Sequence, residues 1–157
     1  MGVHLTDLMI WLFGPVDKVF ASTAKRALKF KTGDVVTASL QHSSGLNTQI
    51  TAILKTPHYQ RVTIWGENGW VELVDSSHPD TPGPSFMKMV MNDGAIKEEK
   101  YEWTNTVSAN IHNFIDSIQG QSKYLFTDVE KFQNISVLEA IYKSSLSKQN
   151  EKVESFN

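Results

Sequence analysis

Cysteine is missing from this 157-residue chain, and neither sign of charge dominates it. The lack of cysteine excludes a disulfide framework, a cysteine-based zinc site and a thiol nucleophile. Lysine and arginine total 15 against 17 aspartate and glutamate residues, so the net charge of −2 argues against nucleic acid as the main partner. No run reaches the roughly 20 apolar residues that a membrane-spanning helix needs. The first apolar run, 8–13, also lacks the basic flank of a secretory signal. We therefore expect a cytoplasmic protein with no membrane span.

The signatures of several common sites are also missing. The sequence contains no G-x-G-x-x-G, no G-x-x-x-x-G-K-[ST], no H-E-x-x-H and no G-x-S-x-G pattern. Gly66 and Gly69 form the nearest glycine pair, but they stand between two expected strands and predict a turn rather than a phosphate cradle. We also expect no metal site, because four of the five histidines show no spacing typical of metal ligands: His42, His58, His78 and His112.

The length of the chain is typical of one domain, which we expect to span residues 1–157. A chain of this length cannot hold both a complete dinucleotide-binding domain and a full substrate domain. Apolar spacing predicts a helix over 5–13, ended by Gly14-Pro15, and later helices over 111–118 and 129–146, the last opened by a capping box at 127–130. Between them, alternating patterns predict strands at 16–28, 35–42, 46–55, 59–65, 70–74, 86–91 and 96–103. A loop rich in proline is expected over 75–84.

This order predicts an α+β fold, a largely antiparallel open sheet with helices packed on one face. The uncovered face would carry Trp65, Trp70 or Tyr101, depending on the register. Large apolar groups on an open sheet face usually mark a partner surface, so we expect a homodimer formed through the sheet.

Two groups of residues are candidates for chemistry. His4 and Asp7 are three positions apart in the first predicted helix, so the carboxylate can orient the imidazole, and His4 becomes a candidate general acid or base. The structural alternative, favoured by spacing alone, is that both residues stand at a helix start, where Asp7 complements the helix dipole. The second group is a basic run at the end of the first expected strand, which suits a phosphate-bearing ligand or, more simply, a solvated strand end: Lys25, Arg26, Lys29 and Lys31.

Residues 2–16 resemble the opening helix of the C-terminal domain of the Gfo/Idh/MocA oxidoreductases. The family pattern there is Asp-x-Gly-x-His-x-x-Asp, followed by an apolar helix that ends in Leu-x-Gly-x-Val. Gly2, His4 and Asp7 match the pattern, and the first aspartate would fall one position before Met1. The resemblance continues in a Gly-x-x-Gly strand pair at 64–72 and in two closing helices at 114–120 and 138–145.

The resemblance implies a C-terminal domain like that of glyceraldehyde-3-phosphate dehydrogenase. Family members join such a domain to an N-terminal Rossmann domain and transfer hydride between NAD or NADP and a sugar, polyol or related carbonyl compound. It implies that His4 acts at the substrate hydroxyl or carbonyl, with Asp7 orienting it, and that the sheet face mediates dimerisation. The Rossmann domain has no counterpart in these residues, so we expect the chain alone to bind no cofactor and to be inactive.

Two other functions are compatible with the same residues. The chain could act as a non-catalytic interaction or oligomerisation module that uses its sheet face and the 75–84 loop. It could also be a small, self-contained enzyme built on His4 and Asp7.

Overall fold

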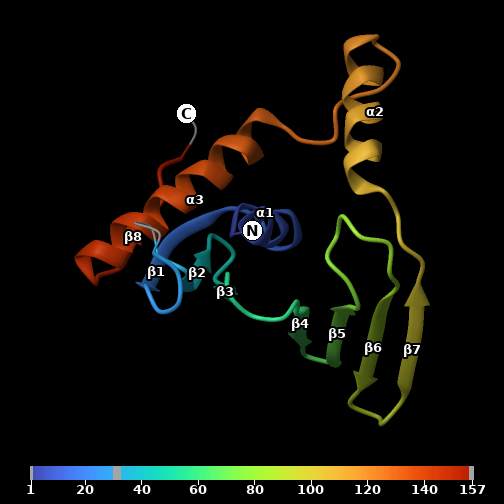
Figure 1. The fold of residues 1–157 in the computed structure, drawn as a ribbon, viewed down its shortest axis with the longest axis horizontal. Helices are drawn as coiled ribbons and strands as arrows, with labels where there is room; N and C mark the ends of the chain where they lie inside the picture. The colour runs from blue at the N-terminus through green and yellow to red at the C-terminus, as the bar shows by residue number, and fades with distance from the viewer. Residues whose placement is uncertain (1, 30–32, 156–157) are drawn as a thin grey trace. The chain divides into compact units, whose positions relative to one another are not determined.

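The computed structural model describes residues 2–29 and 33–155 and divides the chain into two units (Figure 1). Unit 1 combines the residues up to Lys55 with those from Leu125 onward, and unit 2 is the intervening segment Thr56–Tyr124. The elements in chain order are α1 (Gly2–Phe13), β1 (Val16–Ala24), β2 (Val35–His42), β3 (Asn47–Ile53), β4 (Gln60–Gly66), β5 (Gly69–Asp75), β6 (Ser85–Met91), β7 (Ile96–Tyr101), α2 (Thr106–Ile118), α3 (Asp128–Ser147) and β8 (Glu151–Lys152).

Unit 1 is an antiparallel sheet in the order β3-β2-β1-β8, with α3 packed on β1 and α1 packed on α3. Alternate residues of the strands supply its core, because successive side chains of a strand point to opposite faces. Val19 of β1, Leu40 of β2 and Val137 of α3 are each 0% exposed. The outer face of the same strands carries polar residues such as Thr37, Gln41 and Gln49, which are exposed.

Two buried polar side chains fasten the helices to this sheet. The Ser144 hydroxyl accepts the backbone N–H of Ala21 at 2.8 Å and donates to the carbonyl of Gln149 at 2.6 Å. His42, only 1% exposed, places Nδ1 2.8 Å from the carbonyl of Gly14 and Nε2 3.0 Å from Thr48 Oγ1. A carbonyl only accepts, so Nδ1 carries the proton and closes the C-terminal end of α1.

The first predicted strand is wrong beyond Ala24, where β1 ends. The backbone N–H groups of Arg26, Ala27 and Leu28 donate to the Asp34 carboxylate at 2.6–2.7 Å instead of joining a strand ladder. The amide of Asp34 in turn donates to the carbonyl of Ala24 at 3.0 Å, which closes the connection between β1 and β2. A carboxylate that accepts several amide N–H groups can hold such a connection in one conformation.

Asp34→Asn is expected to lower the melting temperature of the chain by roughly 5 °C, because the amide side chain brings no charge to three N–H donors. These bonds, that of Arg26 first, hold the pKa of Asp34 below its ordinary value of 3.8. Its stabilising effect is therefore complete above about pH 3.8 and is lost as the pH falls through the lower pKa of the folded state. Thermal unfolding at pH 7 and pH 3 checks this. The gap between wild type and variant should shrink in acid, and Asp116→Asn in α2 serves as the control. An equal gap at both pH values would contradict the assignment.

Unit 2 holds a second antiparallel sheet in the order β4-β5-β6-β7. Its register places Trp65, Trp70, Val90 and Ile96 in one row across the four strands. A charged row lies on the same side, where Arg61 contacts Glu72 at 3.6 Å and Lys88 contacts Glu98 at 2.9 Å. We call this side the tryptophan face. The opposite side is mostly apolar and also carries Tyr101, so Tyr101 does not share a face with the two tryptophans.

The α+β class and the antiparallel pairing are confirmed, and the strands form two sheets rather than one continuous sheet. The short strand β8, which pairs with β1, had no sequence signal. The capping box is confirmed, since Thr127 and Glu130 satisfy each other's backbone N–H groups at the start of α3. In the described part of the chain, no helix combines the length and apolarity needed to cross a bilayer.

Candidate functional site

Helix α1 carries both candidate residues for proton transfer. His4 is exposed and Asp7 is half-buried. Residues three positions apart lie on the same side of a helix, so both side chains serve one surface of α1. In the part of the chain that the structure describes, no hydrogen bond or ion pair joins them. The geometry therefore gives an exposed imidazole with a carboxylate one turn away, and not a preformed His–Asp pair.

The position of Asp7 in α1 does not support its alternative role, which was to complement the helix dipole at the helix start. Helix α1 begins at Gly2, and no acidic residue lies in its first turn. Asp7 stands in the second turn, whereas the attraction between a carboxylate and the helix dipole fades beyond the first. Asp7 is thus available to act on a neighbour rather than to stabilise the start of α1.

A buried hydrogen-bond pair fixes α1 between these two residues. Thr6 is 1% exposed, and its hydroxyl lies 2.5 Å from Oδ1 of Asn134 in α3. The amide of Asn134 donates to the carbonyl of Val3 at 3.3 Å. Asn134 is only 8% exposed, which agrees with a structural role. Thr6 and Asn134 therefore set the position from which His4 and Asp7 project.

The other sequence candidates are placed differently. Lys25, Arg26 and Lys29 lie in the connection after β1 and not on a strand, and Lys31 lies outside the described residues. Among residues 2–29 and 33–155, no three His, Cys, Asp or Glu side chains gather as metal ligands. His42 is fully engaged at the end of α1, as described above.

The described residues do not fit a nicotinamide dinucleotide. Gly66 and Gly69 belong to the hairpin between β4 and β5, where a Cβ on Gly69 would lie 2.2 Å from the carbonyl oxygen of Val90. This glycine is needed for close strand packing rather than for a phosphate contact. A dinucleotide cradle requires a glycine-rich loop between a strand and a helix N-terminus, and no such loop leads from a strand into a helix in the described part of the chain.

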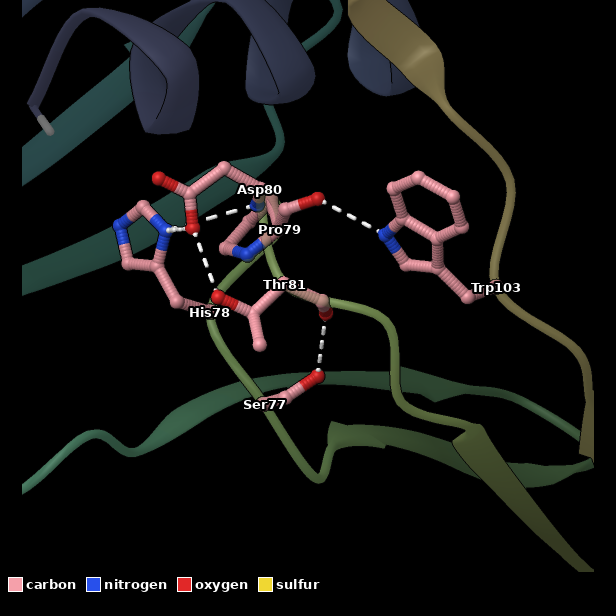
Figure 2. A network of polar contacts seen from close by, with 6 residues as sticks. All are labelled: Ser77, His78, Pro79, Asp80, Thr81 and Trp103. Carbon is pink, nitrogen blue, oxygen red and sulfur yellow. Dashed lines mark hydrogen bonds and ion pairs between the residues drawn. The ribbon is translucent and has the colours of Figure 1, made fainter.

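A polar cluster in unit 2 was not anticipated from the sequence. The loop between β5 and β6 is held by its own side chains: Ser77 Oγ donates to the carbonyl of Thr81 at 2.8 Å, and His78 Nδ1 lies 2.5 Å from Oδ1 of Asp80. Figure 2 shows the indole N–H of Trp103 aimed at the carbonyl of Pro79, 3.0 Å away. The hydrogen bond from His78 lowers the pKa of Asp80. The proline content predicted a loop, but no sequence pattern predicted that Trp103 would fasten it.

A comparison with protein families identifies the family to which these helices and strands belong. Residues 1–154 match the family described as "Oxidoreductase family, C-terminal alpha/beta domain", that of the Gfo/Idh/MocA proteins. The chain is a Gfo/Idh/MocA C-terminal domain. A comparison with curated proteins finds no match.

Solved structures share the fold of this Gfo/Idh/MocA domain at low identity. Aldose-aldose oxidoreductase from Caulobacter crescentus, complexed with glycerol, matches with a TM-score of 0.80 at 18% identity over 97% of this chain and 46% of that one. The WlbA dehydrogenase from Bordetella pertussis, in complex with NADH and UDP-GlcNAcA, matches with a TM-score of 0.71 at 23% identity over 99% and 44%. An oxidoreductase from Agrobacterium radiobacter, in complex with NAD+, L-tartaric acid and magnesium, matches with a TM-score of 0.78 at 16% identity over 97% of this chain and 47% of that one. The chain spans about half the length of these structures.

Proposed function

We propose that this domain supplies the substrate-binding and proton-transfer half of an NAD(P)-dependent oxidoreductase that acts on a sugar, polyol or related carbonyl compound in the cytoplasm. The observation that carries the proposal is the exposed His4 with Asp7 one turn away on α1, in a domain of an oxidoreductase family. Solved relatives of the same fold contain NADH with UDP-GlcNAcA, or glycerol, which supports the substrate class.

His4 would exchange a proton with the substrate hydroxyl or carbonyl oxygen, a task that suits an imidazole near neutral pH. Asp7 would orient the imidazole ring, because a carboxylate oxygen accepts a hydrogen bond from a ring N–H. The buried pair of Thr6 and Asn134 would keep α1 rigid during this exchange, because a displacement of about 1 Å at a catalytic group can cost 100-fold in rate.

The test joins this chain in frame to the coding sequence upstream of it and screens neutral sugars, polyols and nucleotide sugars for a change in nicotinamide absorbance. We expect turnover with at least one compound, and turnover should require the upstream segment. A complete screen with no turnover by the joined protein would contradict the proposed substrate class.

The 157-residue chain alone is expected to bind NAD and NADP with dissociation constants weaker than about 1 mM, because no dinucleotide cradle is built from its described residues. Isothermal titration calorimetry with both cofactors checks this expectation, and the joined protein is the positive control. Micromolar binding by the chain alone would show that it holds the cofactor itself. That result would favour the self-contained enzyme over an oxidoreductase half.

We also propose that the domain forms a homodimer through the tryptophan face of unit 2. Trp65 is 76% exposed and Ile96 is 62% exposed, and apolar groups of this size seldom remain in water as a contiguous row. The competing reading, a non-catalytic oligomerisation module, would use the same face. It differs in requiring no role for His4.

A further inference from the structure

Helix α1 presents a tryptophan to solvent. Trp11 is 67% exposed, whereas Val3 and Leu12, the other exposed large apolar side chains of this helix, are each 37% exposed. Within residues 2–29 and 33–155, the indole N–H of Trp11 has no hydrogen-bond partner in the protein. Packing in unit 1 therefore leaves most of the indole, and its one donor, open to a ligand.

The helical repeat places this indole beside the proposed proton-transfer residues. The buried side of α1 consists of three residues: Thr6, Met9 and Ile10. Each residue advances about 100° around the helix axis, so His4 and Trp11, seven positions apart, differ by only about 20°. Both lie opposite the buried side, and Asp7 is adjacent to Trp11 because the two are four positions apart. His4, Asp7 and Trp11 therefore share one surface of α1.

The spacing along α1 leaves room for one ring between Trp11 and His4. Seven residues rise about 10 Å along the helix axis. Side chains of a helix tilt toward its N-terminus, so the indole, the longer of the two side chains, extends over the turn that separates it from His4. A six-membered ring is about as wide as one helical turn of roughly 5.4 Å. Such a ring can lie on the indole while one of its hydroxyl groups reaches the imidazole.

The chemistry of this surface favours a neutral ring. An indole offers a flat apolar surface to the C–H groups of a sugar, and its N–H can donate to a sugar oxygen. The sequence of α1 contains no lysine or arginine, and its one carboxylate is that of Asp7. The helix thus offers no cationic side chain for a phosphate or carboxylate group. An open-chain polyol has no flat face, so it gains less from the indole than a ring compound does.

We propose that Trp11 is a substrate-contact residue that holds a cyclic, uncharged sugar or cyclitol on α1 with one hydroxyl group at His4. The inference rests on the proposed function and narrows its substrate class from sugars and polyols in general to ring compounds. Trp11 acts on binding and takes no part in proton transfer. Its loss should therefore raise KM, whereas the loss of a proton-transfer group lowers kcat.

The test uses the joined oxidoreductase and the compound that the screen identifies. The best substrate should be a neutral ring compound, and an open-chain polyol as the best substrate would overturn the proposal. Trp11→Ala should raise KM for that substrate at least about tenfold and leave kcat within about threefold of wild type. Trp11→Phe keeps a ring and should hold KM within about threefold. An unchanged KM in Trp11→Ala would overturn the contact, while the observed turnover would still support the oxidoreductase.

Two further measurements separate substrate contact from a structural role. Tyr142→Ala on α3 is the matched control, because it removes another ring of unit 1 that is 61% exposed, and it should leave KM within about twofold. Trp11→Ala should keep the melting temperature of the joined protein within about 2 °C. A clear fall in melting temperature with an unchanged KM would show that Trp11 packs against the upstream segment, which would overturn the proposal.

A joined protein without any turnover would contradict the proposed function, and binding then decides the role of Trp11 separately. Saturation-transfer difference NMR with D-glucose and D-glucitol compares a ring with its open-chain polyol. A stronger signal for D-glucose that is lost in Trp11→Ala and kept in Tyr142→Ala would support the contact. Equal signals for the two compounds, or a D-glucose signal that survives in Trp11→Ala, would overturn it.

Discussion

His4→Asn in the joined oxidoreductase is expected to lower kcat by roughly 10²–10⁴-fold, the usual contribution of a positioned general acid or base. Asparagine keeps a polar side chain of similar reach but cannot exchange a proton near neutral pH. His4 is exposed on α1 and makes none of the described hydrogen bonds, so the substitution removes no structural contact. The melting temperature should therefore stay within about 1 °C of wild type while turnover falls.

The controls separate proton transfer from a general effect of the substitution. His112→Asn makes the same change on α2, and it should leave kcat within about twofold of wild type. Asp7→Asn should lower kcat by a smaller factor than His4→Asn, because it removes the orienting group and keeps the base. Steady-state kinetics with the compound found in the screen supplies each value. A His4→Asn protein that retains wild-type kcat would leave the non-catalytic module as the better account of this domain.

Trp65→Ala is expected to raise the dissociation constant of the homodimer by at least about 30-fold, since tryptophans at the centre of an interface commonly contribute 2 kcal/mol or more. The register supports this expectation. Trp65 lies beside Trp70, and the adjoining row of Glu72, Lys88 and Glu98 alternates in charge, so two copies related by a twofold axis could pair opposite charges. Sedimentation velocity over a concentration series measures the constant.

Tyr101→Ala is the matched control, because it removes an aromatic ring from the opposite side of the same sheet. Tyr101 is 45% exposed, so it tests whether any exposed ring would give the same effect. The Tyr101 variant should keep the dimer within about threefold of wild type. A wild-type chain that sediments as a monomer at micromolar concentration would remove the dimer altogether, and equal effects of the two variants would assign it to another surface.

The sequence predicted best the elements that local chemistry determines. Strand 35–42 is confirmed at both ends, and the capping box of Thr127 and Glu130 marks the start of α3. The sequence-based prediction failed where a side chain further along the chain competes with the backbone hydrogen bonds of a strand. Residues 25–28 have the composition of a strand, but the N–H groups of Arg26, Ala27 and Leu28 are taken by Asp34, which is six to eight positions later in the chain. Periodicity could not reveal that competition, nor could it separate the strands into two sheets.

The candidate site could likewise be predicted only in part. His4 and Asp7 were found because a spacing of three on a helix can be read from the sequence, and their roles remain a prediction. The buried partner of α1 could not be found by spacing, since Thr6 and Asn134 are 128 positions apart. The loop between β5 and β6 also depends on a contact across 24 positions, between the indole of Trp103 and the carbonyl of Pro79.

The pairing of Thr6 with Asn134 also has a consequence for the order of folding. Unit 1 is assembled from the two ends of the chain, and all of unit 2 is synthesised between them. During translation α1 leaves the ribosome before α3 exists, so its contacts with α3 cannot form until the last helix is complete. Unit 2 has only local strand pairings and is fully synthesised before α3, so it can form first. The helix that carries His4 is therefore expected to be locked onto α3 only after unit 2 has been made.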